Sequence, residues 1–498
     1  MSRINSNVSS LISQRVLGQQ NKTLSTSLER LSTGLRINRG ADDPAGLIAS
    51  ENLRSEKASI TAAIGNAERA DQVINIAEGG LQEVSNLLVE LQSLVGQSAN
   101  DAGLNTEEKE ANQLQIDSVL QTIDRIAGST SFEGVKLLNG TYDFTITGQA
   151  ATVNSFQINA AKLESGDSRA VNVLVTASAQ HAGLFLSFGA AALNTGGATS
   201  SYVVELAGVK GSREFSFASG TALTAVASAV NTFSSVTGLS AKVSGTGIVV
   251  KSQGFGSDEF VSVDVVDDGT QAGSIFSLSA IDEDVSKTSG GTAFSAVTAP
   301  VRDEGQDVTA IINGVAATAK GKVARINTDF LDLSIELTTA GSQAAGSISA
   351  FTITGGGAKF NLGPNVDLNN QASIGISNVA SRFLGSAAEG FLSELGSGKD
   401  SNVVDGDLES AQDIVNEAIG QVAKLRGRLG AFQKNVIGAT TRSLGVALEN
   451  ATAAESVIRD TDFASETAQL TRNQILVQAS TNVLSIANSR PQNVLNLL

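Results

Sequence analysis

Residues 60–95 read ITAAIGNAERADQVINIAEGGLQEVSNLLVELQSLV, with an apolar side chain at every third or fourth position. An alternation of three and four residues is the pattern of a coiled-coil seam, the apolar stripe that one helix packs against another. These 36 residues would extend roughly 54 Å as a helix, at ~1.5 Å per residue. The stretch therefore predicts a long helical rod. Its eleven seam positions are Ile60, Ala63, Ala67, Ala70, Ile74, Ala77, Leu81, Val84, Leu88, Leu91 and Val95.

The helix has a recognisable start. Asp43 can cap its first turn, and Pro44 suits the first helical position because the N–H that proline lacks has no partner there. A second helix is expected from about residue 106 to 127, ending at Gly128. Its predicted apolar face carries Leu114, Leu120, Ile123 and Ile126.

A second seam lies near the other end of the chain. Ser443 and Asn450 are its polar exceptions, and polar residues in a seam weaken it but fix its register. Two seams so far apart in sequence predict an antiparallel hairpin, although two separate hairpins are an alternative. In the single hairpin Leu88 and Leu91 are expected to face Leu425, Leu429 and Phe432. The second seam is Val415, Ala418, Val422, Leu425, Leu429, Phe432, Val436, Ala439, Ser443, Val446, Asn450, Ala453 and Val457.

Amphipathic arms flank the two seams, at residues 4–35 and 464–488. Once the seams pair with each other, we expect the arms to have no partner within the chain. Their polar residues keep them soluble until they order on assembly. The arms therefore predict contacts between subunits. The predicted contact residues are Leu11, Leu24, Leu28, Leu31, Leu35, Arg36, Asp43, Leu88, Leu91, Leu425, Leu429, Phe432, Leu470, Ile475, Val483, Leu484, Leu495 and Leu498.

Between the helical ends, residues 141–390 are rich in Gly, Thr, Val and Phe in short alternating runs, which is typical of an all-β region. Asn313-Gly314 between two apolar runs is a hairpin signal. A short helix is expected from Thr221, its cap, to Gly238, with Leu223, Val226, Ala227 and Val230 on one face. The fold class predicted is α+β multidomain. The clearest strands are at 142–147, 214–217, 239–243, 247–251 and 260–266.

The composition argues against several function classes. The 498 residues include no Cys and a single histidine, His181, which excludes cysteine nucleophiles, Cys-ligated metals and the two-histidine metalloprotease motif. His181 is interpreted as a solvated loop residue. We therefore expect no catalytic residue, no cofactor-binding residue, no metal ligand and no enzyme. The acidic runs at 267–268 and 282–284 are interpreted as solvated surface.

Charge and hydropathy limit the partners. A net charge of −16 opposes binding to nucleic acid. No stretch approaches the ~18 to 20 apolar residues of a membrane span, so no membrane insertion is expected. The residues after Met1 contain no apolar core of a cleavable signal peptide. Either the protein is cytoplasmic, or it leaves the cell by a route that reads no such signal.

One long motif resembles a known family. Residues 31–50, LSTGLRINRGADDPAGLIAS, closely resemble the N-terminal signature of bacterial flagellins. Residues 220–231, GTALTAVASAVN, more weakly resemble an insertion module of flagellins and hook-associated proteins. Further matching segments are QSAN at 97–100, FEGVKLL at 132–138, RDTDFASE at 459–466, QILVQAS at 474–480 and PQNVLNLL at 491–498.

The resemblance implies a structural subunit that polymerises into the flagellar filament and serves swimming motility. Its implied partners are identical copies, the filament cap, hook-associated proteins and an export chaperone at the C-terminal arm. Its implied location is extracellular, reached through the flagellar type III channel without a cleavable signal peptide. The implied domains are arms at 1–42 and 461–498, coiled-coil parts at 43–140 and 391–460, and an outer region at 141–390 with the module near 200–266.

The resemblance also has limits and rivals. In flagellins that stimulate the innate flagellin receptor, the stretch that matches Leu88–Leu94 carries basic residues, whereas this chain has Glu90 and Gln92 there. A changed charge at an interface rim weakens binding, so receptor activation is not expected. The alternatives to a filament subunit are a hook–filament junction protein, a filament-displayed adhesin and a filament-displayed enzyme.

Overall fold

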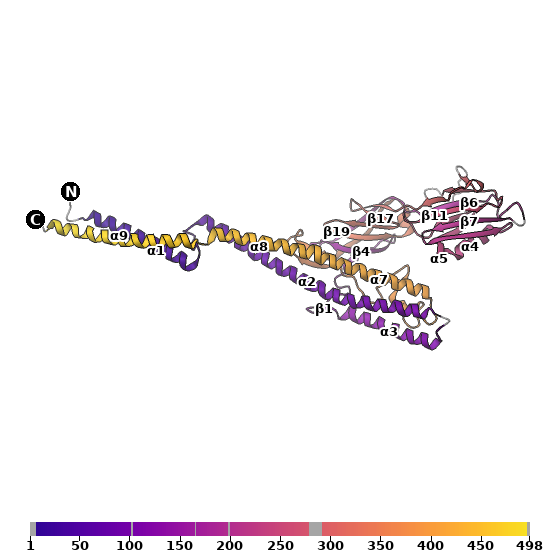
Figure 1. Cartoon of the computed structure of the whole chain (residues 1–498), viewed down its shortest axis with the longest axis horizontal. Coiled ribbons are helices and arrows are strands. Elements are labelled where there is room, and N and C mark those ends of the chain that lie inside the picture. The colour runs from indigo at the N-terminus through magenta and orange to yellow at the C-terminus, as the bar shows by residue number, and fades with distance from the viewer. Residues whose placement is uncertain (1–5, 101–102, 165, 198–199, 278–290, 496–498) are drawn as a thin grey trace. The chain divides into compact units, whose positions relative to one another are not determined.

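A computed structural model describes residues 6–100, 103–164, 166–197, 200–277 and 291–495, and Figure 1 labels its helices and strands. The chain forms two compact units. Unit 1 contains both chain ends and comprises Met1–Asn75, Phe360–Ala372 and Gly430–Leu498. Unit 2 comprises Ile76–Lys359 and Ser373–Leu429.

The first predicted seam is confirmed. Helix α2 is Pro44–Ser98, and the Asp43 carboxylate accepts a hydrogen bond from the backbone N–H of Gly46 at 2.9 Å, so Asp43 caps the helix as expected. All eleven seam residues from Ile60 to Val95 are buried, and none is more than 2% exposed. The alternation of three and four residues therefore identified the buried face correctly.

The antiparallel hairpin is also present. The C-terminal half of the hairpin consists of α7 (Leu408–Ala431), a π-helical segment at Phe432–Ile437, and α8 (Gly438–Arg459). As the residue number rises along α2, the number of its bonded partner falls, which excludes two separate hairpins. The bonds, at 2.7–2.9 Å, join Lys57 to Glu455 and Asp71 to Gln433 in unit 1, and Glu78 to Arg426 and Gln92 to Asn416 in unit 2.

The predicted register of the hairpin is wrong. The bonds from Glu78 and Gln92 bracket Leu88, so Leu88 lies level with residues near 420, between their partners Arg426 and Asn416. Leu425 and Leu429 lie further along α7, and the half-buried ring of Phe432 packs against Phe360 with centroids 6.2 Å apart. A heptad pattern looks the same after a shift of seven residues, so the spacing alone could not determine the register.

The second seam is correct only up to Leu429. From the last residue of the π-helical segment onward, the buried positions are Ile437, Leu444 and Ala451. A π turn holds one residue more than an α turn, so each later side chain moves to a new face of the helix. Predicted seam residues beyond this segment therefore face solvent, namely Ala439, Ser443, Val446, Asn450, Ala453 and Val457. The two polar exceptions, Ser443 and Asn450, are not part of the seam.

The observed register predicts a specific cross-link. The chain has no Cys, so a Gln92→Cys, Asn416→Cys variant would carry the only two thiols. Because the native side chains are in contact at 2.9 Å, mild oxidation or a short thiol cross-linker should join most of the molecules. Gln92→Cys with Lys424→Cys is the matched control, since residue 424 lies two turns, roughly 12 Å, further along α7. Faster cross-linking of the control, read on a denaturing gel, would contradict the register.

Unit 2 also contains helix α3, Thr106–Ser129, which begins with a capping box between Asn105 and Glu108. Ile116, Leu120 and Ile123 are buried, whereas Leu114 is exposed, contrary to its predicted place on the apolar face. The buried Gln113 donates to the carbonyl of Leu395 and accepts from the N–H of Val403. This amide therefore holds a loop before α7 against α3. The short elements outside the helices and the two β-cores are β1 (Ser131–Phe132), β2 (Val135–Lys136), β21 (Ala358–Asn361), β22 (Gln371–Ile374), β23 (Gly385–Ser386), β24 (Gly390–Phe391) and η2 (Leu392–Leu395).

The middle of the chain forms two β-cores in unit 2. The first, β-core A, has sheets of strand order β16-β15-β5-β20-β3 and β17-β18-β19-β4 around a buried cluster drawn from residues 144–179 and 308–353. Arg428 of α7 donates to the carbonyl of Gly375 and to Asn159 of β4, which ties α7 to this core. The elements of β-core A are β3 (Phe144–Thr147), β4 (Val153–Ala161), β5 (Arg169–Ala177), β15 (Thr309–Ile312), β16 (Val315–Ala316), β17 (Thr318–Lys320), β18 (Val323–Asn327), β19 (Leu331–Leu337), α6 (Thr339–Gln343) and β20 (Gly346–Gly356).

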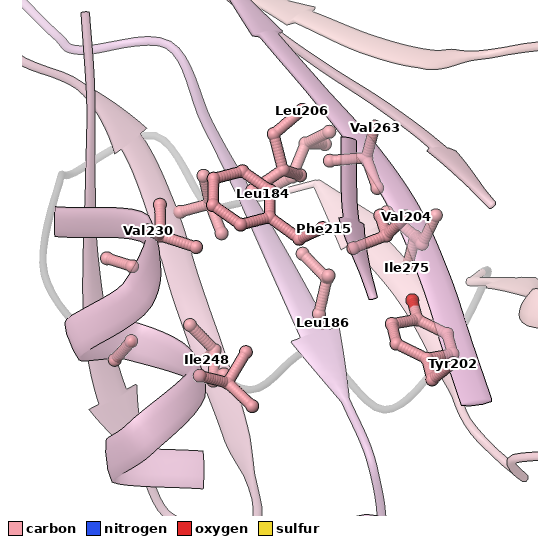
Figure 2. Packing of buried hydrophobic residues seen from close by; sticks show 14 of the residues in the cluster. Leu184, Leu186, Tyr202, Val204, Leu206, Phe215, Val230, Ile248, Val263 and Ile275 are labelled. Atoms are coloured by element: carbon pink, nitrogen blue, oxygen red, sulfur yellow. The ribbon is translucent and has the colours of Figure 1, made fainter. Parts of the chain in front are cut away.

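The second, β-core B, lies within residues 182–304 and has strand orders β13-β12-β6-β10-β9 and β14-β11-β7-β8. Figure 2 shows Leu186, Val204, Phe215 and Val230 within its buried cluster. This core is wider than the 200–266 module expected from sequence. Its elements are β6 (Gly183–Ser187), β7 (Ser201–Gly208), β8 (Gly211–Ala218), α4 (Leu223–Thr232), α5 (Ser234–Thr237), β9 (Leu239–Ser244), β10 (Gly247–Ser252), β11 (Phe260–Asp267), β12 (Ser274–Ser277), β13 (Thr292–Ala293), η1 (Phe294–Ala296) and β14 (Val301–Glu304).

Local predictions in the two cores hold well. The four residues predicted for one face of the short helix are all buried, and the helical stretch closes at Gly238 with a φ of 74°. Thr221 is not its cap, because the hydroxyl of Thr221 bonds the carbonyl of Ala218 and the cap position is Ala222. Asn313 and Gly314 have φ of 48° and 84° and join β15 to β16, as the hairpin signal indicated.

β-core B is inserted into β-core A at a joint that the sequence did not reveal. Gln180 and Gln306 form a β-bridge where the chain leaves and re-enters β-core A. Asp307 accepts hydrogen bonds from Ser257 and from the N–H of Gly321; burial raises its pKa, but these bonds outweigh burial and hold the pKa below its usual value.

His181 lies at this joint and is not the solvated loop residue predicted. It is half-buried and its ring packs against the ring of Phe255, with centroids 3.7 Å apart and the ring planes tilted by 34°. Its Nδ1 lies 2.8 Å from the carbonyl oxygen of Gly254. Of the two acidic runs, 267–268 lies on the surface and 282–284 lies outside the described residues.

Candidate subunit interface

The two arms pair with each other inside unit 1, which corrects the prediction that they lack a partner within the chain. They form α1 (Val8–Thr33) and α9 (Phe463–Leu495), which run side by side in Figure 1. Asn7 at the start of α1 donates to the carbonyl of Ala487, and Arg30 near its end lies 3.7 Å from Glu466. The arms are therefore antiparallel.

Polar and small side chains make this pairing. The Ser10 hydroxyl bonds the Asn488 side chain at 2.6 Å, and the Asn473 amide donates to the Ser27 hydroxyl at 3.1 Å. A hydrogen bond of this kind adds only about 1 kcal/mol of net stability. These hydrogen bonds by themselves therefore hold the arms together only weakly. The buried residues of the pair are Ser10, Ser13, Ser27, Glu466, Asn473 and Ala487.

Large apolar side chains of the same helices remain exposed. Leu11 on α1 and Ile475 on α9 are 62% and 61% exposed, and Leu28 and Val483 are exposed by at least half. Fully burying such a side chain contributes about 1.5–3 kcal/mol. The arm pair thus retains a large driving force for association with another surface.

The predicted contact residues fall into three environments. Leu11, Leu28, Ile475 and Val483 are exposed on the arms. The half-buried arm residues are Leu24, Leu31, Leu35, Leu470 and Leu484. Buried inside the chain, and so not at its surface, are Leu88, Leu91, Leu425 and Leu429. Leu495 is the last residue of α9, and Leu498 lies outside the described residues.

Arg36 and Asp43 instead belong to the junction between the arms and the hairpin. Their side chains lie 3.6 Å apart, and Arg36 also donates to the carbonyl of Ile458 at 2.7 Å. The N–H of Thr461 donates to the carbonyl of Gly34 at 2.9 Å. The segment after α1 and the segment around the end of α8 therefore each donate a hydrogen bond to the other. These contacts fix where the arm pair leaves the hairpin within unit 1.

Sequence reasoning missed three sets of residues. Ile486 is exposed on α9 and follows the helical spacing of that arm, so the same pattern could have identified it. Val366, in the loop between β21 and β22, is 93% exposed and has no such signal. The buried serines and Asn473 also have none, because apolar periodicity does not report a polar interface.

Exposed large apolar residues concentrate in unit 1. Of 25 such residues among those the structure describes, 14 belong to unit 1, which holds less than a third of the chain. Large exposed apolar patches mark interaction surfaces, whereas scattered single residues do not. The surface of unit 1 is therefore the candidate site of association.

Known proteins match both helical ends. The family model of the bacterial flagellin N-terminal helical region matches residues 4–143, and that of the C-terminal helical region matches residues 412–498. The B-type flagellin of Pseudomonas aeruginosa is 30% identical over 511 residues, covering 99% of both chains. The chain belongs to the bacterial flagellin family.

Other flagellins align over the full length as well. The flagellin of Salmonella typhimurium is 29% identical, covering 99% of both chains, and flagellin B of Helicobacter pylori is 27% identical, covering 100% of this chain and 99% of its own. The flagellin signature at residues 31–50 coincides with the end of α1, the Arg36–Asp43 junction and the start of α2. Within the described ranges, no helix is both long and apolar enough to cross a membrane.

Proposed function

We infer that this chain is a structural subunit of the bacterial flagellar filament and serves swimming motility. The observation that carries this function is that the arms bond to each other through polar side chains while large apolar side chains stay exposed. Buried polar side chains bond α1 to α9, and large apolar side chains of both helices, such as Leu11 and Ile475, stay exposed and are available to neighbouring subunits. Contacts between different surfaces of identical copies extend an open helical array without closing it.

The finer features of this role are part of the same proposal. The partners are identical copies, an export chaperone that covers the apolar face of α9, the filament cap and hook-associated proteins. The protein acts outside the cell in the filament, after export through the flagellar type III channel. We propose a purely structural role without enzymatic activity or a cofactor. Glu90 is exposed on α2, so the expectation that the innate receptor is not activated stays a prediction.

Seeded assembly tests the function. Purified protein is mixed with short filament fragments, and its assembly is followed by light scattering and electron microscopy. A filament subunit should lengthen the seeds until a constant concentration of free protein remains. Protein that only caps the fragments, with at most one added layer, would instead indicate a hook–filament junction protein.

A further inference from the structure

Two Asn-Gly pairs lie in unit 2, Asn139-Gly140 and Asn313-Gly314, and both asparagines are exposed. The sequence contains no other Asn-Gly pair. Asn followed by Gly is the dipeptide most prone to spontaneous deamidation, because glycine has no side chain to hinder attack of its backbone nitrogen on the preceding amide carbon. The two pairs differ in the contacts of the asparagine side chain, and these contacts give them different reactivity.

The side chain of Asn313 is bonded through both of its polar atoms to strand β5. Its Oδ1 accepts a hydrogen bond from the N–H of Asn172 at 2.9 Å, and its Nδ2 donates to the carbonyl of Ala170 at 3.0 Å. Deamidation releases Nδ2 and must therefore break the bond to Ala170, and both bonds resist rotation of the amide. The contacts with β5 protect this pair.

The side chain of Asn139 is held in the opposite way. Its Oδ1 accepts hydrogen bonds from the N–H of Thr141 at 3.1 Å and from the Thr141 hydroxyl at 2.6 Å. Two donors on this oxygen stabilise the negative charge that develops there when a nucleophile adds to the amide carbon. Within the described part of the chain, no hydrogen bond holds the Nδ2 of Asn139 or the N–H of Gly140. The oxygen is therefore activated, while the leaving group and the attacking nitrogen are not restrained.

We propose that Asn139-Gly140 is a self-deamidation site with Thr141 as its positioning residue, an inference independent of the proposed function. The Gly140 nitrogen bonds to Cγ of Asn139, and the Cγ–Nδ2 bond breaks. The proton that the Gly140 nitrogen loses leaves with Nδ2 as ammonia, and a cyclic succinimide remains. Water then opens the ring at either carbonyl and gives aspartate, or isoaspartate with one extra methylene in the main chain.

The site lies where the chain enters β-core A, between β2 and β3. This segment pairs with the segment that follows β22, because the carbonyl of Leu138 accepts from the N–H of Val379 at 3.1 Å and the carbonyl of Tyr142 accepts from the N–H of Ile376 at 2.9 Å. Residue 139 lies between these two bonded positions. Isoaspartate there changes the spacing of the pairing, and either product adds a negative charge.

Incubation of the folded full-length protein in mildly alkaline buffer made with heavy-oxygen water tests the proposal. Only product formed during the incubation takes up the isotope, and peptide mass spectrometry locates it. Asn139 should convert at least about tenfold faster than Asn313, which is the matched control because it has the same dipeptide. In concentrated denaturant, which removes the contacts of both side chains, the two rates should converge.

Two variants test the role of Thr141. Thr141→Val removes one of the two donors and should slow conversion of Asn139 at least about threefold, whereas Thr141→Ser keeps the hydroxyl and should convert like the parent. Thr141 is exposed, so neither substitution should change thermal unfolding.

Three results would count against the inference. Conversion of Asn139 no faster than that of Asn313 in the folded protein would overturn it. A rate difference that persists in denaturant would also overturn it, because the neighbours in sequence rather than the folded contacts would then be the cause. Conversion of Thr141→Val at the parent rate would overturn the role of Thr141.

Discussion

A chain without residues 1–35 is expected to fold and to form no filament. Removing these residues deletes α1, and with it the exposed Leu11 and Leu28 and the partner of α9. The hairpin seam from Ile60 to Val95 and the two β-cores contain none of the deleted residues. Circular dichroism should show helix and strand with a cooperative unfolding transition, and electron microscopy of seeded samples should show no growth. Removal of residues 464–498 should have the same effect.

A milder variant distinguishes the effect of the exposed apolar side chains on assembly from the effect of the pairing between the arms. Leu11→Gln with Ile475→Gln keeps the Ser10–Asn488 and Ser27–Asn473 contacts but removes two exposed apolar side chains. We expect slower seeded growth and a critical concentration raised at least about tenfold, from the ~1.5–3 kcal/mol that each buried side chain contributes. Filaments of normal length and number from either deletion would contradict the assignment of assembly to the arms.

Leu88→Asp should destabilise the helical part of unit 2 by roughly 3–5 kcal/mol, because it places an unpaired charge in a buried seam. Leu88 is completely buried. Its neighbour Val89 is 55% exposed on the same helix, so Val89→Asp is the matched control and should change stability by less than about 1 kcal/mol. Thermal and denaturant unfolding followed by circular dichroism measure both. Leu91→Asp should behave like Leu88→Asp.

If Leu88→Asp lost as little stability as Val89→Asp, the seam would not be buried where the structure places it. A large loss for both would indicate that aspartate disturbs the helix itself rather than its packing. Filament formation by Leu88→Asp at the parent concentration would likewise contradict a structural role for the hairpin.

The sequence predicted the phase of the α2 seam because burial of a helix face depends on local spacing, and all eleven positions agree. The sequence did not predict the register between α2 and α7, because the hydrogen bond between Gln92 and Asn416 lies outside the heptad pattern of apolar residues. Nor did it predict the π turn, because Val446 and Val457 continue the apolar pattern even though they face solvent. A one-residue insertion in a helix changes which face is buried without changing the sequence pattern.

In the arms and the β-region too, features set by neighbouring residues were predictable, whereas contacts between residues far apart in sequence were not. Asn313-Gly314 and the face of α4 were predictable because turn and helix signals are local. The bridge between Gln180 and Gln306, which nests one β-core in the other, joins residues far apart in sequence. The polar pairing of Ser27 with Asn473 was not predictable from a search for apolar stripes.

A high-resolution electron cryomicroscopy structure of the assembled filament tests the central claim most directly. The account predicts that α1 and α9 remain paired through Ser27 and Asn473, and that Leu11, Ile475 and Val483 become buried against other copies. It would be contradicted by a filament in which these apolar side chains stay exposed to solvent, or in which they contact each other within one chain.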